Sequence, residues 1–125
     1  MKFQTDRSRA HGLGSAKDGV DHWWVQRVTA VALVPLGLLF IFPFASTIGE
    51  GHEAVLALYS HPWHAIIAGL FTMVAFNHLR LGLQVVIEDY VHGAMRTIML
   101  LGNTFFCALF GLAGVFAIAK IAFAG

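Results

Sequence analysis

Charged residues are scarce in this chain of 125 residues. Asp, Glu, Lys and Arg make up 12% of it, whereas they form about a quarter of an ordinary soluble domain. Apolar residues make up 58%. A soluble protein this short has too little interior to bury so much apolar surface, so the surplus must face lipid. The net charge of +1 gives no basis for nucleic-acid binding.

Cysteine is almost absent, and an N-terminal signal peptide is not apparent. Cys107 is the only cysteine, so it makes no internal disulfide and cannot hold an iron–sulfur cluster, which takes about four ligands. We interpret it as a small hydrophobic side chain. Residues 1–22 mix charges with glycines and contain no apolar core, so we expect no cleavage and a polar N-terminal segment.

Long apolar runs are present, by contrast. Three of them reach the length of about 20 residues that crosses a hydrocarbon core, at about 28–48, 64–87 and 97–122. The sequence therefore predicts an all-α integral membrane domain over residues 23–125, with three transmembrane helices. Membrane lipids are its expected surroundings.

Several residues predict where these helices begin, bend and pack. We expect Asp21 to cap the first helix, and Ser60 with Pro62 to start the second. Pro35 and Pro43 are expected to kink the first helix rather than end it, because neighbouring helices satisfy the freed carbonyls. The third span is rich in small residues, which suits close helix packing. These are Gly102, Ala108, Gly111, Ala113, Gly114 and Ala117.

Basic residues predict the orientation. Five Lys or Arg precede the first span, none lies in the loop 49–63, and Arg96 flanks the turn expected at 88–96. The positive-inside rule therefore puts the N-terminus and this turn in the cytoplasm, and the C-terminus on the outer side. Lys120 is the one exception.

Polar side chains are concentrated in the second span, where a central charge costs about 2.5–3.5 kcal/mol on insertion scales. At about 100° per residue they form two stripes. The first holds Asn77, Arg80, Gln84 and Glu88, and the second holds His78, Gly82, Val85, Asp89 and His92. A helix that only anchors a protein does not need two such faces, so we expect both to be functional.

His78 is the histidine expected deepest in the membrane. It precedes Glu88 by ten residues, which is about 15 Å at 1.5 Å per residue. Gly82, one turn on, is expected to leave a side-chain-free notch where a flat macrocycle fits. Three interpretations remain open: a hydrogen bond to a neighbouring helix, ligation of haem iron, or proton transfer. If His78 ligates haem, a second axial ligand has to come from another subunit.

Asp89 and Tyr90 fall where the second helix leaves the bilayer. One interpretation is an interfacial tyrosine beside a solvated carboxylate. The other is a pocket for a quinone head, because a tyrosine hydroxyl donates to a quinone carbonyl and a nearby carboxylate takes part in proton exchange. Arg80, about 200° around the helix from His78, serves either a haem propionate or a carboxylate on a partner helix.

The stretch 78–93 resembles the small membrane-anchor subunit of succinate dehydrogenase, the D-type subunit of respiratory complex II. In that family a histidine is followed by glycine four residues later, and by Asp-Tyr eleven and twelve residues later. His78, Gly82, Asp89 and Tyr90 match this pattern. The three-span layout and residues 26–30 fit as well, and residues 88–93 resemble the alphaproteobacterial branch.

The resemblance implies half of a heterodimeric anchor bundle in the bacterial inner (cytoplasmic) membrane. The partners would be a cytochrome b-type anchor subunit, an iron–sulfur subunit and a flavoprotein subunit. His78 would ligate haem b jointly with the partner anchor, and Tyr90 with Asp89 would contact ubiquinone. Arg27 matches an arginine at the head of the family's first helix. The chain itself would not be an enzyme, because electrons from succinate would reach quinone through the other subunits, joining the tricarboxylic acid cycle to the respiratory chain.

Two other functions fit the sequence. The first is the anchor of a fumarate reductase, or of another quinone-linked membrane cytochrome b. The second is a small proton-coupled transporter that uses Arg80, Glu88 and Asp89. Three spans are too few for a monomeric transporter of the usual repeat design, so this function requires a homo-oligomer.

Overall fold

A computed structural model describes residues 16–124 of the chain. Its elements in chain order are α2 (Ala16–Ala45), α3 (His52–Ser60), α4 (Pro62–Tyr90) and α5 (Ala94–Ala124). No strand occurs within this range, which confirms the all-α prediction. The three long helices α2, α4 and α5 are each long and apolar enough to cross a membrane, so the three predicted spans are confirmed.

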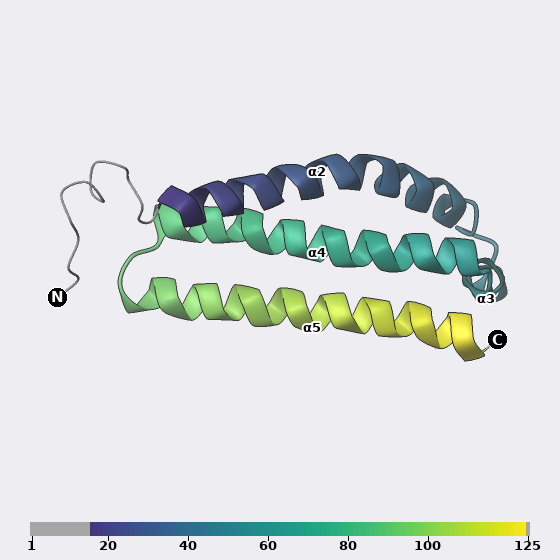
Figure 1. The fold of residues 1–125 in the computed structure, drawn as a ribbon. Coiled ribbons are helices and arrows are strands. Elements are labelled where there is room, and N and C mark those ends of the chain that lie inside the picture. The colour runs from purple at the N-terminus through teal and green to yellow at the C-terminus, as the bar shows by residue number, and fades with distance from the viewer. Residues whose placement is uncertain (1–15, 125) are drawn as a thin grey trace.

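The three long helices lie side by side with α4 in the middle (Figure 1). Both α2 and α5 pack against α4, and within residues 16–124 they do not pack against each other. The start of α2 and the α4–α5 turn share one end of the molecule, while α3 and the end of α5 share the other. The start of the first span and the turn after the second therefore lie on the same side of the molecule.

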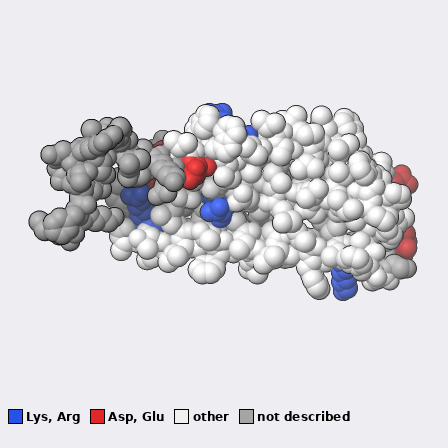
Figure 2. All heavy atoms as spheres, viewed as in Figure 1, with Lys and Arg blue, Asp and Glu red and all other residues white. Residues whose placement is uncertain are grey.

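The surface of this layer is largely apolar. On the face shown in Figure 2 the charged side chains lie towards the two ends, and a broad uncharged band separates them. Large apolar side chains point outward from all three long helices, among them Val31, Phe42, Met73, Phe105 and Phe116. Exposed apolar area of this extent marks a surface that lipid or other membrane helices cover.

The N-terminal boundary of the first helix differs from the prediction. Helix α2 already includes residues 16–22, so Asp21 lies inside the helix and is not its N-cap. Those residues therefore belong to the helix rather than to a separate polar segment, and residues 1–15 of that predicted segment lie outside the described residues. A helix of 30 residues is longer than the hydrocarbon core, so its first turns can carry charge outside the core.

The helix continues through both internal prolines and ends at Ala45. Figure 1 shows α2 arched away from α4 in its middle part. A proline removes one backbone hydrogen-bond donor, and its ring crowds the preceding turn. A helix that contains it therefore usually bends at that point. The prediction that Pro35 and Pro43 do not end this helix is confirmed.

The predicted loop 49–63 contains a short helix, α3, that the hydropathy pattern did not indicate. Gly49 and Gly51, in the turn between α2 and α3, adopt φ values of 84° and 90°, a left-handed conformation that favours glycine, and Gly51 is the N-cap of α3. Helix α3 packs against both α4 and α5, with Tyr59 buried. Nine residues are too few to cross a membrane, so the helix was invisible to a search for spans.

The ends of α4 also differ from the prediction. The N-cap is His61 rather than Ser60, since His61 Nδ1 accepts from the backbone N–H of Trp63 at 3.2 Å. Pro62 occupies the first helical turn, as expected. The helix runs to Tyr90, so the turn to α5 spans only residues 91–93. Gly93, at φ 72°, supplies the backbone conformation for that tight turn.

Two glycines of α5 allow its close contact with α4. A Cβ added to Gly111 would lie 3.3 Å from Phe76 Cβ, and one added to Gly114 would lie 2.9 Å from Thr72 Cγ2. The backbones therefore approach as closely as they do in small-residue packing between membrane helices. Not every small residue of this span contributes, because a Cβ added to Gly102 would meet no atom within 4 Å.

Candidate functional site

His78 lies near the middle of α4. It follows Pro62 by sixteen residues and precedes Tyr90 by twelve, or about 24 Å and 18 Å at 1.5 Å per residue. Because α4 is the central helix, its flanks contact both neighbours. The imidazole is half-buried. Helix geometry therefore places the ring far from either end of the span.

The imidazole contacts α2 through Thr29. Nδ1 of His78 lies 2.9 Å from Thr29 Oγ1, and this hydroxyl is also 2.8 Å from the carbonyl of Val25 and 3.0 Å from that of Gln26. Thr29 is only 9% exposed. Among the described residues, the ring nitrogen Nε2 has no hydrogen-bond partner. One ring nitrogen is thus held by the protein, and the other is left for a ligand or a partner.

The seam between α2 and α4 continues towards the end that carries the α4–α5 turn. His22, Gln26 and Thr29 are spaced by four and three residues, so they share one face of α2. Two buried atoms of this row, His22 Nε2 and Gln26 Oε1, have no hydrogen-bond partner within residues 16–124. Unpaired buried polar atoms are rare in proteins, and they mark a place where water, a ligand or a partner chain is expected.

The notch predicted beside Gly82 is not free of side chains. The amide of Gln26 occupies it, because a Cβ added to Gly82 would lie 3.6 Å from Gln26 Nε2. The expectation of an open slot at this glycine was therefore wrong. A sequence pattern on one helix does not show which side chain of a neighbouring helix fills a gap.

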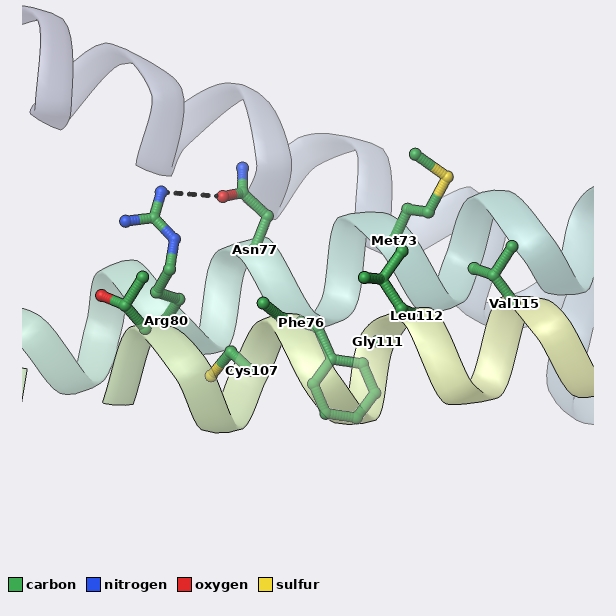
Figure 3. A pocket seen from close by; sticks show the side chains of 10 residues that line it. Met73, Phe76, Asn77, Arg80, Cys107, Gly111, Leu112 and Val115 are labelled. Carbon is green, nitrogen blue, oxygen red and sulfur yellow. Dashed lines mark hydrogen bonds between the residues drawn. The ribbon is translucent and has the colours of Figure 1, made fainter. Parts of the chain in front are cut away.

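Arg80 and Asn77 lie on a different side of α4, beside a groove of about 410 Å³ between α4 and α5. Nη2 of Arg80 donates to Asn77 Oδ1 at 3.0 Å, and Figure 3 shows the two side chains next to each other. Cys107 and Gly111 line the same groove from α5. The predicted separation of Arg80 from His78 is confirmed: one residue faces the α5 side and the other faces α2.

A hydrogen bond joins α4 and α5 near this groove. Asn103 Nδ2 donates to the backbone carbonyl of Arg80 at 2.9 Å, and Cys107 Sγ donates to Asn103 Oδ1 at 3.5 Å. Both residues of α5 are buried. Cys107 is buried, in agreement with its interpretation as a small hydrophobic side chain.

Asp89 and Tyr90 lie at the end of α4 and are exposed, Tyr90 by 80% of its surface. Neither lies near His78, which is about three turns away along the helix. One turn before this end, Gln84 donates to Glu88 at 3.0 Å. Any pocket around Tyr90 therefore needs walls from outside the described residues.

Arg27 lies on the exposed side of α2. Its guanidinium stands 5.4 Å from the centre of the Trp23 ring, in cation–π geometry. It thus points away from the seam that holds Thr29 and His78. Its side chain is available to a neighbouring subunit or to lipid headgroups.

The residues that matter most to His78 were not identified from the sequence. Thr29 and Gln26 entered the prediction only through the resemblance of residues 26–30, without a role. The spacing of His22, Gln26 and Thr29 does indicate a polar face on α2. The residue spacing within one helix does not give the register that brings this face against His78.

A family model for the succinate dehydrogenase/fumarate reductase transmembrane subunit matches residues 1–119. The chain belongs to this family. The three candidate spans are thus those of a family member rather than of an unrelated protein, and the predicted family is confirmed.

The relatives of this family member are anchor subunits. The succinate dehydrogenase hydrophobic membrane anchor subunit of Paracoccus denitrificans is 36% identical over 121 residues, which are 97% of this chain and 94% of the relative. The succinate dehydrogenase membrane anchor subunit of Reclinomonas americana is 33% identical over 86 residues, 66% and 72% of the two chains. The hydrophobic membrane anchor subunit of Rickettsia bellii is 32% identical over 89 residues, 71% of each chain.

These names agree with two predictions. Paracoccus and Rickettsia confirm the alphaproteobacterial likeness, and a membrane anchor is a non-catalytic subunit, as expected of this chain. No solved structure matches the chain.

Proposed function

We propose that this anchor-family chain ligates haem b through Nε2 of His78 and contributes to the site where ubiquinone is reduced. The observation that carries the proposal is the imidazole near the middle of α4, held at Nδ1 by Thr29 and without a partner at Nε2 among residues 16–124. A histidine that only joined two helices would be satisfied by the Thr29 contact, and it would gain nothing from a second open nitrogen.

The donor chemistry fits a haem. A neutral imidazole binds haem iron through one nitrogen, and the other nitrogen is usually held by a hydrogen bond. When bound, haem b supplies one-electron redox chemistry.

A partner anchor subunit would supply the other residue that holds the haem. Because α2 and α5 flank α4 without touching each other, α4 is not enclosed within a bundle of this chain alone. A second anchor packed on this layer would bring its own histidine to the iron and cover the exposed apolar side chains. Arg80 then pairs with a carboxylate on that partner, because it faces the α5 side and not His78.

Tyr90 and Asp89 form this chain's part of the quinone site. Their exposure at the end of α4 supports a site completed by other subunits at the aqueous edge of the membrane. Reduction of a quinone takes up two protons, so access to water is required there. The Tyr90 hydroxyl would donate to a quinone carbonyl, and the Asp89 carboxylate would take part in proton exchange.

The remaining partners follow from this assignment. An iron–sulfur subunit and a flavoprotein subunit would dock on the cytoplasmic side of the inner membrane, the side on which the positive-inside rule puts the α4–α5 turn. Electrons from succinate pass through those subunits to quinone. The anchor of a fumarate reductase remains the alternative, and the quinone that co-purifies with the complex distinguishes the two.

The haem assignment is tested with His78→Ala in the purified complex. We expect the b-type band to vanish from the reduced-minus-oxidised spectrum. His64→Ala is the matched control, because His64 is a half-buried histidine near the opposite end of the same helix and should keep the band. An undiminished band in an assembled His78→Ala complex would rule out this ligand.

The quinone assignment is tested with Tyr90→Phe, which removes only the hydroxyl. We expect succinate–quinone activity to fall about 100-fold, the lower end of the range for a lost proton-transfer group. Succinate oxidation with an artificial acceptor should be unchanged. Tyr59→Phe is the control, since Tyr59 is buried in α3 at the other end of the molecule. Full quinone activity in Tyr90→Phe would remove Tyr90 from the site.

A further inference from the structure

Thr29 is the residue of α2 that contacts the imidazole of His78. We propose that Thr29 is a positioning residue: its hydroxyl keeps the ring proton on Nδ1, and it thereby leaves the lone pair of Nε2 for iron. The proposal rests on haem ligation by His78, and it adds the residue that selects the binding-competent form of the ring.

The assignment follows from counting protons. Thr29 Oγ1 has one proton and three polar neighbours, namely His78 Nδ1 at 2.9 Å and the carbonyls of Val25 and Gln26 at 2.8 and 3.0 Å. A carbonyl can only accept. When the hydroxyl donates to a carbonyl, Oγ1 accepts from Nδ1–H, and both contacts are hydrogen bonds.

The opposite arrangement is poorer. If the hydroxyl donates to Nδ1, the ring proton must sit on Nε2, which has no acceptor among the described residues. One hydrogen bond is then made in place of two, and the Nε2–H has no partner among the described residues. The geometry therefore selects the Nδ1–H form, which is the form that binds iron through Nε2.

Burial makes this selection persistent. Thr29 is 9% exposed, so water does not readily replace its hydroxyl. The bond from a helical threonine to the carbonyl four residues earlier also restricts its side-chain rotamer. The acceptor offered to Nδ1–H is thus fixed in space, and the ring plane of His78 is fixed with it.

A donated Nδ1 proton also changes the ligand. It raises the basicity of the imidazole, and losing such a partner typically weakens metal binding by about 10- to 100-fold. A more basic ligand favours oxidised iron. Removing the Thr29 hydroxyl should therefore weaken haem retention and raise the reduction potential of any haem that remains.

The test replaces Thr29 in the intact complex by valine, which has the same shape without the hydroxyl. We expect less haem per complex, and in the remaining haem a higher reduction potential and an altered low-spin EPR signal. Thr29→Ser restores the hydroxyl and should restore all three. Thr72→Val is the matched control, since Thr72 makes the same type of bond, to the Ala68 carbonyl at 2.8 Å, away from His78.

The outcomes separate this proposal from haem ligation itself. If His78→Ala removes the haem and Thr29→Val changes neither haem content, potential nor EPR signal, only the role of Thr29 is refuted. If Thr29→Ser behaves as Thr29→Val does, Thr29 acts through packing and the proposal is overturned. If the valine variant does not assemble, Thr29→Ser against Thr29→Ala gives the same comparison of hydroxyl and no hydroxyl.

Discussion

The two sides of α4 are joined to their neighbours by different means. On the α2 side the contacts around the candidate site are polar: His78 meets a threonine hydroxyl, and an amide lies against Gly82. On the α5 side the helices approach at Gly111 and Gly114, and Asn103 adds one hydrogen bond. Both sides join long apolar helices, so the difference reflects what each side is for.

The comparison indicates a division of tasks. Lipid gives little hydrophobic drive for two helices to associate, so close steric packing and isolated hydrogen bonds hold them together. The α5 side uses these means. The α2 side contains two buried polar atoms, His22 Nε2 and Gln26 Oε1, that have no partner among the described residues. Such groups are costly in a membrane, so we expect a function to require them. Stability should depend mainly on the α5 side, and haem binding on the α2 side.

The strongest challenge to this division is Gly114→Leu. Even the Cβ would lie 2.9 Å from Thr72 Cγ2, so the leucine must force α4 and α5 apart. Overpacking of this kind typically costs about 1–3 kcal/mol or more. We expect a large loss of assembled complex from membranes, measured by quantitative immunoblotting and by the thermal midpoint in detergent.

Gly102→Leu is the control for this substitution. It places the same side chain on the same helix at a position where an added Cβ meets nothing within 4 Å, so assembly should be nearly normal. Equal losses in the two variants would mean that the α5 side does not depend on close approach. Any Gly114→Leu complex that does assemble should keep its haem spectrum.

A smaller effect is expected from Asn103→Leu, which keeps the side-chain size and removes the donor to the Arg80 carbonyl. Hydrogen bonds between membrane helices average about 0.6 kcal/mol and reach about 1.7 kcal/mol. The thermal midpoint should fall slightly while the haem potential stays constant. Thr104→Val is the comparison, because Thr104 bonds only to its own helix at Leu100. A shifted potential in Asn103→Leu would show that the two sides are coupled.

The two candidate sites differ in the same way. The surroundings of His78 include a residue of this chain that orients the ring, whereas Tyr90 is exposed at a helix end. Substitutions within this chain should therefore affect the haem site strongly. Quinone reduction should be affected as strongly by substitutions in the partner subunits as by substitutions in this chain.

The amino-acid sequence by itself determined the fold class, the number of spans, the family and the candidate residue His78. Hydropathy and the spacing from His78 to Tyr90 are local properties, and they do not depend on how helices meet. Helix α3 and the true ends of α2 and α4 were missed, because caps and short helices give little hydropathy signal.

Only the tertiary structure decided which residues of different helices face each other. The contact of Thr29 with His78 joins positions 49 residues apart, and the filling of the space at Gly82 by Gln26 depends on the same register. That register results from the packing of whole helix faces, including the arch of α2. No pattern within one helix contains it, which is why the histidine was found from the sequence and its hydrogen-bond partner was not.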